Sequence, residues 1–232
     1  VYSSGTIGQE GAVYYPESDP FTKVIVHGTY TTSTANTWFE VQSSTGQICY
    51  YGNTTGARQS YTAGNSPRIY AWYLDYVEDP LGNYMNYTYN KWSYCMYPNT
   101  IMYGNNKNGS TGLQNTVTFS YETRSNDPQL FVIEGVKGTM DRRLKTITSK
   151  TGNSVYRVYD LQYNTTGDAS GTKYSRLTSV TERNGAGDVM QPVKLNWSYL
   201  PSLYSIPVSP QVNAACVYPA VAFSEQQFIA GD

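Results

Sequence analysis

Apolar and polar residues alternate with a period of two along most of the chain. Successive side chains of a β-strand point to opposite faces, so this pattern predicts strands with one apolar face. Residues 24–28 alternate in this way, and residues 37–52 predict a hairpin that turns at 43–46. Residues 53–67 are mainly polar and predict a loop.

The clearest hairpin is expected at residues 69–92. Aspartate, proline, glycine and asparagine occupy residues 79–83. Proline presets a turn, and glycine or asparagine accepts a positive φ. Alternating aromatic residues precede and follow this turn, which predicts two paired strands. Further hairpins are expected at residues 142–164 and 175–200.

Three of these hairpins share one internal repeat. Each begins with leucine, carries valine or isoleucine three residues later, and reaches glycine eight residues after the leucine. One hairpin cannot bury its own apolar face, so the repeats are expected to stack in one sheet, with rows of tyrosine as building material. Glycine at the turns is expected to have a positive φ where the turn requires it. The leucine and glycine pairs are Leu74 and Gly82, Leu144 and Gly152, and Leu177 and Gly185.

The predicted fold is therefore all-β, with antiparallel hairpin repeats that form an extended or curled sheet. Residues 1–23 are rich in glycine and proline and predict an N-terminal loop segment. Residues 24–199 form the hairpin module. Residues 200–221 contain four prolines and predict a linker, and residues 222–232 begin a new element.

The amino-acid composition agrees with an all-β fold and narrows the range of possible functions. The chain of 232 residues contains 24 Tyr and only 14% charged residues, with a formal net charge of −1. This balance gives no electrostatic footprint for nucleic acid and no basic membrane patch. No apolar run approaches the roughly 20 residues that span a bilayer. A surface rich in Asn, Thr and Tyr favours a secreted or cell-surface protein.

Five Asn-x-Ser/Thr sequons make the chain a glycoprotein candidate, although a sequence so rich in these residues also forms sequons by chance. The three cysteines leave two possibilities open, one disulfide plus a free thiol or three buried thiols. No Cys-x-x-Cys motif or Cys/His cluster is present, and no metal or cofactor is expected. The sequon asparagines are Asn53, Asn86, Asn108, Asn164 and Asn196, and the cysteines are Cys49, Cys95 and Cys216.

The sequence offers little for catalysis. His27 is the only histidine and lies in an alternating strand, without an evident nucleophile beside it. Two acidic pairs, Asp75 with Glu78 and Glu122 with Asp127, are better explained by turns and ion pairs than by a glycosidase dyad. We expect no catalytic residue.

The order of the motifs resembles a known family. The series "YYPESDPFTKVIVHG", "TWFEVQSSTGQICYYG", "WYLDYVEDPLGNYMNYTY" and "VYRVYDLQY" is similar to the SpvB-type N-terminal region, which the virulence-plasmid B protein shares with the B subunit of insecticidal Tc toxins. This resemblance covers roughly residues 13–199. The segment "VYDLQYN…SRLTSVTERNG" also resembles YD-repeat (Rhs) units. "QFIAGD", residues 227–232, is similar to the opening of an FG-GAP propeller blade.

The resemblance implies a non-catalytic scaffold connected with virulence. Such a module contributes to a β-shell that encloses or presents a toxin or effector. Its partners are other segments of a longer chain or toxin-complex subunits. The ADP-ribosyltransferase found elsewhere in SpvB-type proteins needs a Glu-x-Glu pair, and this sequence contains none.

A binding module is the alternative interpretation. Exposed aromatic rings on a flat sheet can stack on sugar rings, with Asn and Gln as hydrogen-bonding groups. Such a module would bind cell-surface glycans. In the other interpretation the same rings pack between hairpins. The candidate ligand-binding residues are Tyr70, Trp72, Tyr87, Tyr89 and Trp92.

Overall fold

Strands dominate the computed structural model, which describes residues 1–31, 35–63, 66–109, 115–133, 135–164 and 174–197. Within this part of the chain the one helical element is the short 3₁₀ turn η1 (Thr55–Ala57). The chain divides into two units, Val1–Leu195 and Asn196–Asp232. The description below concerns the first unit.

Seventeen strands follow one another along this unit. They are β1 (Tyr2–Ser4), β2 (Val13–Tyr14), β3 (Lys23–His27), β4 (Trp38–Gln42), β5 (Ile48–Tyr51), β6 (Arg58–Ala63), β7 (Ser66–Trp72), β8 (Leu74–Glu78), β9 (Asn83–Trp92), β10 (Cys95–Asn106), β11 (Asn115–Thr123), β12 (Gln129–Ile133), β13 (Val136–Met140), β14 (Arg142–Thr151), β15 (Ser154–Asn164), β16 (Arg176–Asn184) and β17 (Val193–Lys194).

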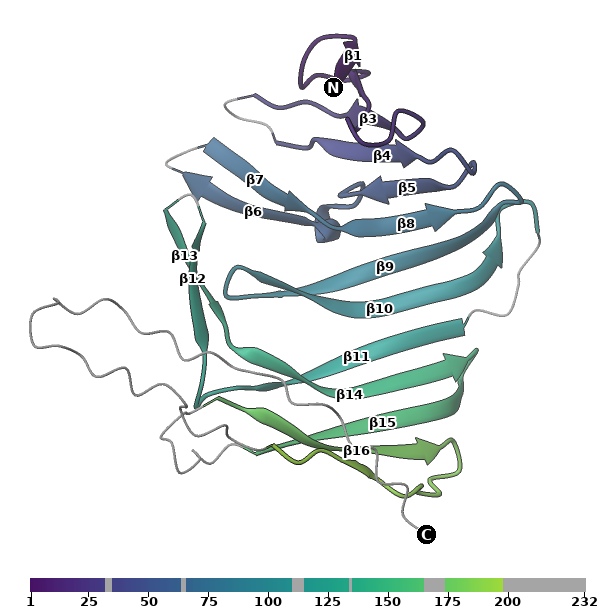
Figure 1. Ribbon diagram of the computed structural model, residues 1–232, viewed down its shortest axis with the longest axis vertical. Coiled ribbons are helices and arrows are strands. Elements are labelled where there is room, and N and C mark those ends of the chain that lie inside the picture. The colour runs from purple at the N-terminus through teal and green to yellow at the C-terminus, as the bar shows by residue number, and fades with distance from the viewer. Residues whose placement is uncertain (32–34, 64–65, 110–114, 134, 165–173, 198–232) are drawn as a thin grey trace, which may run out of the picture. The chain divides into compact units, whose positions relative to one another are not determined.

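Thirteen of these strands form one antiparallel sheet (Figure 1). Its order is β1-β2-β3-β4-β5-β8-β9-β10-β11-β14-β15-β16-β17, so strands that are close in sequence lie side by side. The sheet is open, because β1 and β17 stand at opposite ends of this order. The expectation of an all-β protein built from antiparallel hairpins in an extended sheet is confirmed.

The expected turns form where the sequence placed them. Between β4 and β5, the Gly46 amide donates to the Ser43 carbonyl at 3.0 Å, and Gly46 has a φ of 81°. Between β8 and β9, Asp79 Oδ1 accepts hydrogen bonds from the amides of Leu81 and Asn83, each at 2.9 Å. The short polar side chain of Asp79 thus organises the turn that joins two long strands.

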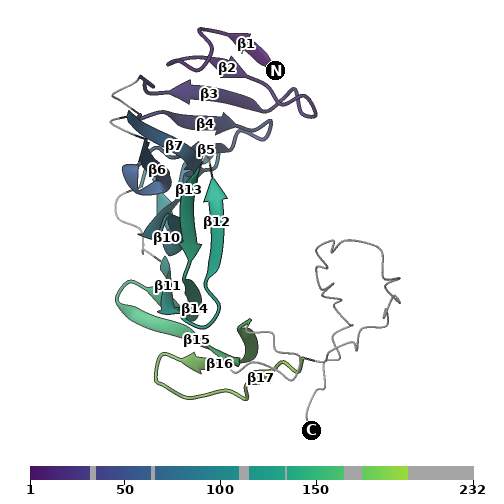
Figure 2. The same cartoon turned by 90° about the vertical axis from the view of Figure 1, so that its left-hand side faces the viewer.

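Two small hairpins leave the main sheet. The β6–β7 hairpin lies between β5 and β8 in sequence, and the β12–β13 hairpin lies between β11 and β14. Both project at the same end of the neighbouring strands, and β12–β13 runs across their direction (Figure 2). The amide of Thr139 in β13 donates to the Ser93 carbonyl in the β9–β10 turn at 3.0 Å, which attaches the second hairpin.

This arrangement corrects two expectations. Residues 53–67 are not a loop, because η1 and β6 lie within them. The strand expected before the turn at residues 79–83 is interrupted at Tyr73, where β7 ends and β8 begins. The Tyr73 amide donates to the Ala57 carbonyl, and the Tyr73 carbonyl accepts from the Gly52 amide, each at 2.8 Å. With these bonds Tyr73 stands between β7 and β8, so the β6–β7 hairpin is not part of the main sheet.

The sheet has little enclosed core. Val26 is the only large side chain below 2% exposure among the described residues. The other buried apolar residues are few, and two of them are small. Cys49 and Cys95 are free thiols, so no disulfide joins them, and burial raises the pKa of each. Cys216 lies outside the described residues.

The expectations for the two ends of the chain have different outcomes. Residues 1–23 contain the short strands β1 and β2 in addition to loops. The expected linker at residues 200–221 and the expected propeller opening at 222–232 lie outside the described residues. The domain boundaries therefore stay predictions.

Candidate functional site

The main sheet has one apolar and one polar face. Residues paired across antiparallel strands share a face, so the register can be followed from strand to strand. The face that we call the apolar face contains, in strand order, Val24, Val41, Cys49, Val77, Met85, Tyr87, Ile101, Val117, Phe119, Ile147, Tyr159, Leu161 and Val180.

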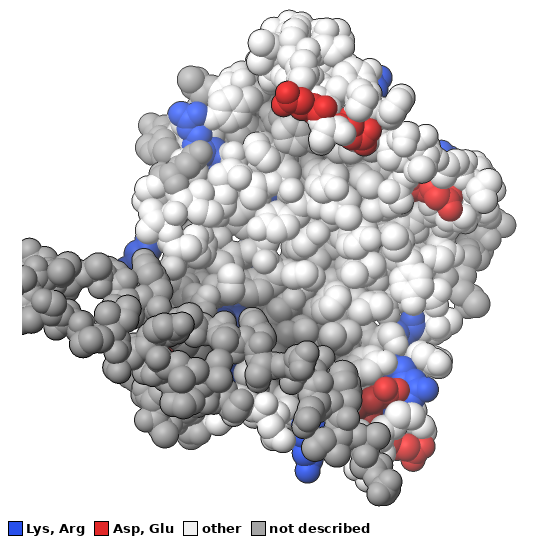
Figure 3. All heavy atoms as spheres, viewed as in Figure 1, with Lys and Arg blue, Asp and Glu red and all other residues white. Residues whose placement is uncertain are grey.

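The apolar face is only partly covered. Of the residues that define it, Val77 alone is buried and the others are half-buried. The described residues outside the main sheet include only η1, two hairpins and loops. On the side of the molecule that Figure 3 shows, the visible charged side chains lie mainly around the margin. The middle of this side is almost free of them.

The repeat leucines lie at equivalent places in this sheet. Leu74, Leu144 and Leu177 each pair with a tyrosine of the preceding strand, and the register shifts directly after each pair. The residue that follows each leucine is therefore an extra residue, as in a β-bulge. A bulge disrupts the ladder and leaves a backbone group in need of another partner.

Tyrosine hydroxyl groups supply that partner. The Tyr89 hydroxyl donates to the Leu74 carbonyl at 2.6 Å, and the Tyr163 hydroxyl donates to the Leu144 carbonyl at 2.7 Å. Tyr121 makes the same kind of bond to Pro98, also at 2.7 Å and also beside a register shift.

We call these three tyrosines the tyrosine relay, because each hydroxyl group bonds to a backbone carbonyl of the neighbouring strand. Tyr89, Tyr121 and Tyr163 are half-buried. Burial raises the pKa of Tyr89 and of Tyr121 to about 12 and also raises the pKa of Tyr163. The hydroxyl groups therefore stay protonated and can donate. The Tyr121–Pro98 bond has no counterpart in the leucine repeat, and sequence reasoning missed it.

Glycine is required at the three repeat positions for different structural reasons. Gly82 and Gly152 have φ values of 83° and 57°, which glycine adopts without strain. Gly185 is not among the glycines with a positive φ. A Cβ atom at Gly185 would lie 2.0 Å from the Val155 carbonyl oxygen, so close backbone approach excludes a side chain there. The positive φ of this turn, 95°, belongs to Gly187.

The structure does not bring the five candidate ligand-binding aromatics together. Tyr70 and Trp72 lie on β7 in the small hairpin, and the other three lie on β9. The Tyr70 hydroxyl donates to the Tyr94 carbonyl at 2.9 Å, and Trp72 Nε1 donates to the Thr37 carbonyl at 2.6 Å. These polar groups serve the fold.

The three aromatics of β9 are also engaged. Tyr89 belongs to the tyrosine relay, and the Tyr87 hydroxyl lies 3.8 Å from Met85 Sδ. The Trp92 ring centroid lies 5.3 Å from that of Tyr97, and the Arg142 guanidinium lies 5.3 Å from the Trp92 ring. No common aromatic floor results.

A different aromatic row crosses the polar face of five neighbouring strands. The ring centroids lie 4.1 to 5.6 Å apart, and three of the four contacts are stacked. Rings that stack on each other across strands stabilise the sheet and do not offer free faces to a ligand. The row consists of His27, Trp38, Tyr50, Tyr76 and Tyr84.

The one histidine links this row to the N-terminal segment. His27 Nδ1 lies 3.0 Å from Glu10 Oε1, and His27 Nε2 lies 3.1 Å from Glu40 Oε2. Glu10 also accepts a hydrogen bond from the Gly28 amide, which is the largest cause of its lowered pKa. A general base needs a free nitrogen, and both ring nitrogens are engaged here.

A buried ionic cluster ties β16 to the loop after β11. Asp127, whose side chain is 2% exposed, accepts from Arg124 Nη2 at 2.6 Å and from the Ser175 amide at 2.6 Å. Burial alone raises the pKa of Asp127, but these hydrogen bonds outweigh it and lower the pKa to about 2. The ion pairs expected for these two carboxylates are present, because Asp127 pairs with Arg124 and Glu122 pairs with Arg143, each at 2.6 Å.

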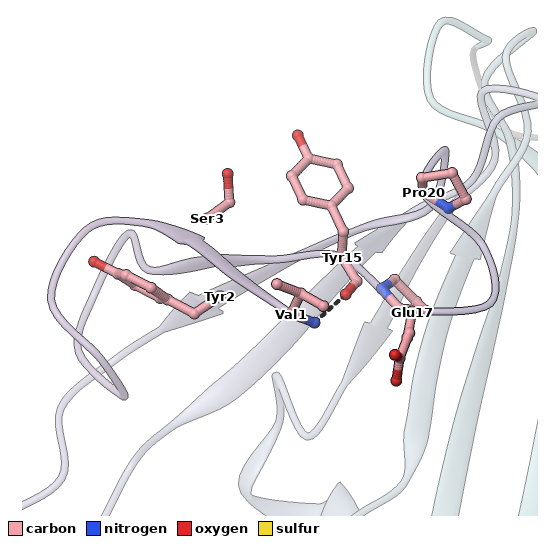
Figure 4. Close-up of a pocket in the computed structure, with 7 residues that line it drawn as sticks. Val1, Tyr2, Ser3, Tyr15, Glu17 and Pro20 are labelled. Carbon is pink, nitrogen blue, oxygen red and sulfur yellow. Dashed lines mark hydrogen bonds between the residues drawn. The ribbon is translucent and has the colours of Figure 1, made fainter.

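Two surface hollows lie at the N-terminal end of the main sheet. One, of about 560 Å³, is lined by β1 and by the residues after β2 (Figure 4). The side chains of Ser3 and Tyr15 point to the same side in this view, and the Val1 amino group donates to the Tyr15 carbonyl beside Glu17. The other hollow, of about 590 Å³, lies between the loop before β4 and the β6–β7 hairpin.

The sequon asparagines differ in accessibility. Asn86 is half-buried in the middle of β9, where it pairs with Tyr76 and Met102. The other four sequon asparagines are exposed. Modification at any of them stays a prediction.

The described ranges contain neither a metal-binding cluster nor a membrane-spanning helix. They contain no group of three or more His, Cys, Asp and Glu side chains that could hold a metal ion. They also contain no helix with the length and apolar character needed to cross a membrane.

The comparisons with known proteins agree with this architecture. The comparison with curated proteins gave no match. The family described as Salmonella virulence plasmid 65kDa B protein, SpvB, matches residues 12–136. The large antiparallel sheet places the chain in the all-β class, and the family match covers more than half of the chain. The chain belongs to the SpvB family.

Solved structures show the same fold at low identity. The N-terminal domain of effector protein SpvB from Salmonella typhimurium strain LT2 has a TM-score of 0.56 and 15% identity, over 75% of this chain and 68% of that chain. A TcdB2-TccC3-Cdc42 structure has a TM-score of 0.60 and 15% identity, over 80% of this chain. A Photorhabdus luminescens Tc holotoxin pore has a TM-score of 0.58 and 16% identity, over 76% of this chain. The chain spans 11% of each of these two toxin chains.

Proposed function

We propose that this chain is a non-catalytic scaffold module of a secreted protein of the SpvB and Tc-B kind. It contributes a section of a β-shell that encloses or presents a toxin or effector. Its partners are other segments of a longer chain or subunits of a toxin complex.

One observation carries this proposal. The main sheet is stabilised within its own plane and exposes much of its apolar face. The tyrosine relay satisfies carbonyl groups at the bulges, so neighbouring strands are joined without a second layer. Exposed apolar surface of this extent is typical of interaction surfaces. A wall of a larger shell needs both a sheet that is stabilised within its own plane and an apolar face that is exposed for interaction.

The ends of the strand order support the same function. Among the described strands, β1 and β17 each have one neighbour in the sheet, so further strands can extend it at either side. An unpaired edge of this kind is a ready template for another strand. The small share of the toxin chains that this fold occupies agrees with a module that is one part of a shell.

The alternative, glycan binding by the five aromatics of residues 70–92, receives less support. The hydroxyl of Tyr70, the indole of Trp72 and the hydroxyl of Tyr89 are bonded to backbone carbonyls. A sugar-binding floor needs free ring faces and free polar groups together.

The test is the mass of the native protein at its source, before and after deglycosylation. We expect a mass far above 25.9 kDa that deglycosylation does not remove. In parallel, a hydrophobic dye is added to the isolated chain and to the native protein. The isolated chain should bind dye through the apolar face, and the native protein should bind less per module. A native mass near 25.9 kDa, or one that exceeds it only by glycans, would overturn the proposal.

A further inference from the structure

The hollow of about 590 Å³ beside the β6–β7 hairpin, which we call the hairpin groove, differs from the other surfaces in its chemistry. Its volume is in the range of small-molecule sites. It is separate from the tyrosine relay. Its lining residues are Gly8, Tyr30, Thr37, Phe39, Tyr61, Arg68, Ile69 and Trp72.

An ordered aromatic wall forms one side of the groove. The rings of Phe39 and Trp72 meet edge to face, with centroids 5.0 Å apart and an interplanar angle of 81°. The hydrogen bond from Trp72 Nε1 to the Thr37 carbonyl fixes the indole. Gly52 leaves room for it, because a Cβ atom there would lie 2.5 Å from Trp72 Cδ1. The wall therefore needs no rearrangement before a ligand packs on it.

The groove also contains a cation without a carboxylate partner. Arg68 donates to the Tyr30 hydroxyl, and its guanidinium lies 5.7 Å from the centre of the Tyr30 ring. No Asp or Glu is among the groove's lining residues, and none of the described carboxylates forms an ion pair with Arg68. Arg68 is exposed, so a negatively charged ligand can reach it.

A buried hydroxyl group is a second, independent feature. Thr37 lines the groove and is 7% exposed, and its Oγ1 has no hydrogen-bond partner in the described structure. A buried polar group without a partner costs free energy and is rare in native proteins. Rotation about the Cα–Cβ bond to another staggered rotamer exchanges the hydroxyl and methyl positions, so a ligand can supply the missing partner.

We propose that the hairpin groove binds a sugar residue that carries a carboxylate. The apolar C–H face of a sugar ring packs on aromatic rings, and its hydroxyl groups bond to tyrosine and threonine hydroxyls. The carboxylate pairs with Arg68, whose planar guanidinium suits carboxylate geometry. A purely apolar ligand would leave Arg68 without a carboxylate and the Thr37 hydroxyl without a hydrogen-bond partner. Sialic acids and hexuronic acids share this chemistry.

Matched pairs of probes test the proposal by isothermal titration with the whole chain. Sialyllactose is compared with lactose, and trigalacturonate with its methyl ester. We expect at least one acidic probe to bind about tenfold or more tightly than its neutral counterpart, because a charge-assisted bond is lost. Whether sialyllactose or trigalacturonate binds identifies the source of the acid. The preference should weaken as salt increases.

Two variants distinguish binding in the groove from binding elsewhere. Arg68→Gln should weaken the acidic probe about tenfold and leave the neutral probe unchanged. Thr37→Val removes a hydroxyl that has no partner, so it should weaken binding severalfold without lowering the melting temperature. Lys137→Gln, which removes an exposed charge from β13, is the matched control and should change neither quantity.

Three results would overturn the proposal. The acidic and neutral probes could bind equally or not at all. Arg68→Gln and Lys137→Gln could have the same effect, which would place binding outside the groove. An acetylated Glu-Phe-Glu peptide could bind while both acidic sugars fail, which would indicate an acidic peptide as the ligand. None of these results depends on whether the chain is part of a shell.

Discussion

The two parts of the main sheet are stabilised in different ways. In the N-terminal region, from β1 to β5, the β6–β7 hairpin covers part of the sheet, with Trp72 against Phe39. Ala12, Val26 and Ala57 are the most buried apolar residues of the described structure, at 0 to 2% exposure. In the relay region, from β8 to β16, the most buried apolar residues keep 7 to 9% exposure.

The comparison shows that the two regions stabilise an open sheet by different means. In the N-terminal region, Trp72 packs against Phe39 and excludes water from the sheet. In the relay region, the Leu74, Pro98 and Leu144 carbonyls, each beside a register shift, accept hydrogen bonds from tyrosine hydroxyls of the neighbouring strand. The relay region should therefore depend on a few hydrogen bonds and close backbone contacts, and the N-terminal region on many small contacts.

The largest expected effect is at Asp127, in the relay region. Asp127→Ala leaves the Arg124 guanidinium and the Ser175 amide without their partner, and removal of one member of a buried pair costs about 3 kcal/mol or more. The free energy of unfolding, measured with urea at neutral pH, should fall by this amount. Glu17→Ala, at an exposed carboxylate, is the control and should change little.

The same carboxylate predicts a pH dependence. Its pKa in the folded protein is about 2, below the usual value of 3.8, so ionised Asp127 stabilises the fold above about pH 4. That contribution, about 2 kcal/mol, is lost as the pH falls towards 2. Asp127→Asn should lack this part of the acid sensitivity. An unchanged pH profile in the variant would show that other groups cause it.

The next effect separates two glycines of the relay region. Gly185→Ala places a Cβ atom against the Val155 carbonyl and should destabilise the protein by about 2 to 3 kcal/mol, because β15 and β16 must separate. Gly152→Ala meets no atom within 4 Å and should cost only about 1 kcal/mol, from its positive φ. The melting temperatures of the two variants measure the difference. Equal losses would contradict the close approach at Gly185.

The sequence was informative where local pattern determines structure. Alternation and turn residues predicted the hairpin at residues 37–52 and the turn at 79–83, because both depend on neighbours in sequence. The repeat predicted that Leu74, Leu144 and Leu177 occupy similar positions. The period of two did not indicate that β7 leaves the main sheet, because a strand in a separate hairpin has the same alternation.

Contacts between distant residues could not be predicted. Ser175 and Asp127 are 48 positions apart, and no local pattern indicates their bond. The hairpin groove combines Gly8, Thr37 and Arg68 from three separate segments. The expected aromatic site stays a prediction, and its five rings lie on two strands, β7 of the small hairpin and β9 of the main sheet. Composition indicates how many rings there are, but not which rings have used their polar groups inside the fold.

The tyrosine relay predicts a smaller and repeated effect. Tyr89→Phe, Tyr121→Phe and Tyr163→Phe each remove one hydroxyl and leave a bulge carbonyl unpaired, which should cost about 1 to 2 kcal/mol. Tyr159→Phe is the matched control, since Tyr159 lies on the same strand and face as Tyr163 and the described structure gives its hydroxyl no bond. Urea unfolding of the four variants makes the comparison. If Tyr159→Phe is as costly as the others, the relay has no special role.

The smallest expected effect is in the N-terminal region. Glu10→Gln weakens the contacts with His27 and the Gly28 amide, but the Glu10 side chain is 62% exposed, so less than about 1 kcal/mol is at stake. The effect should be local, as faster hydrogen exchange of the Gly28 amide with unchanged global stability. Faster exchange in β14 or β15 as well would mean that one cooperative unit includes both regions. The contrast between a packed region and a relay region would then have to be abandoned.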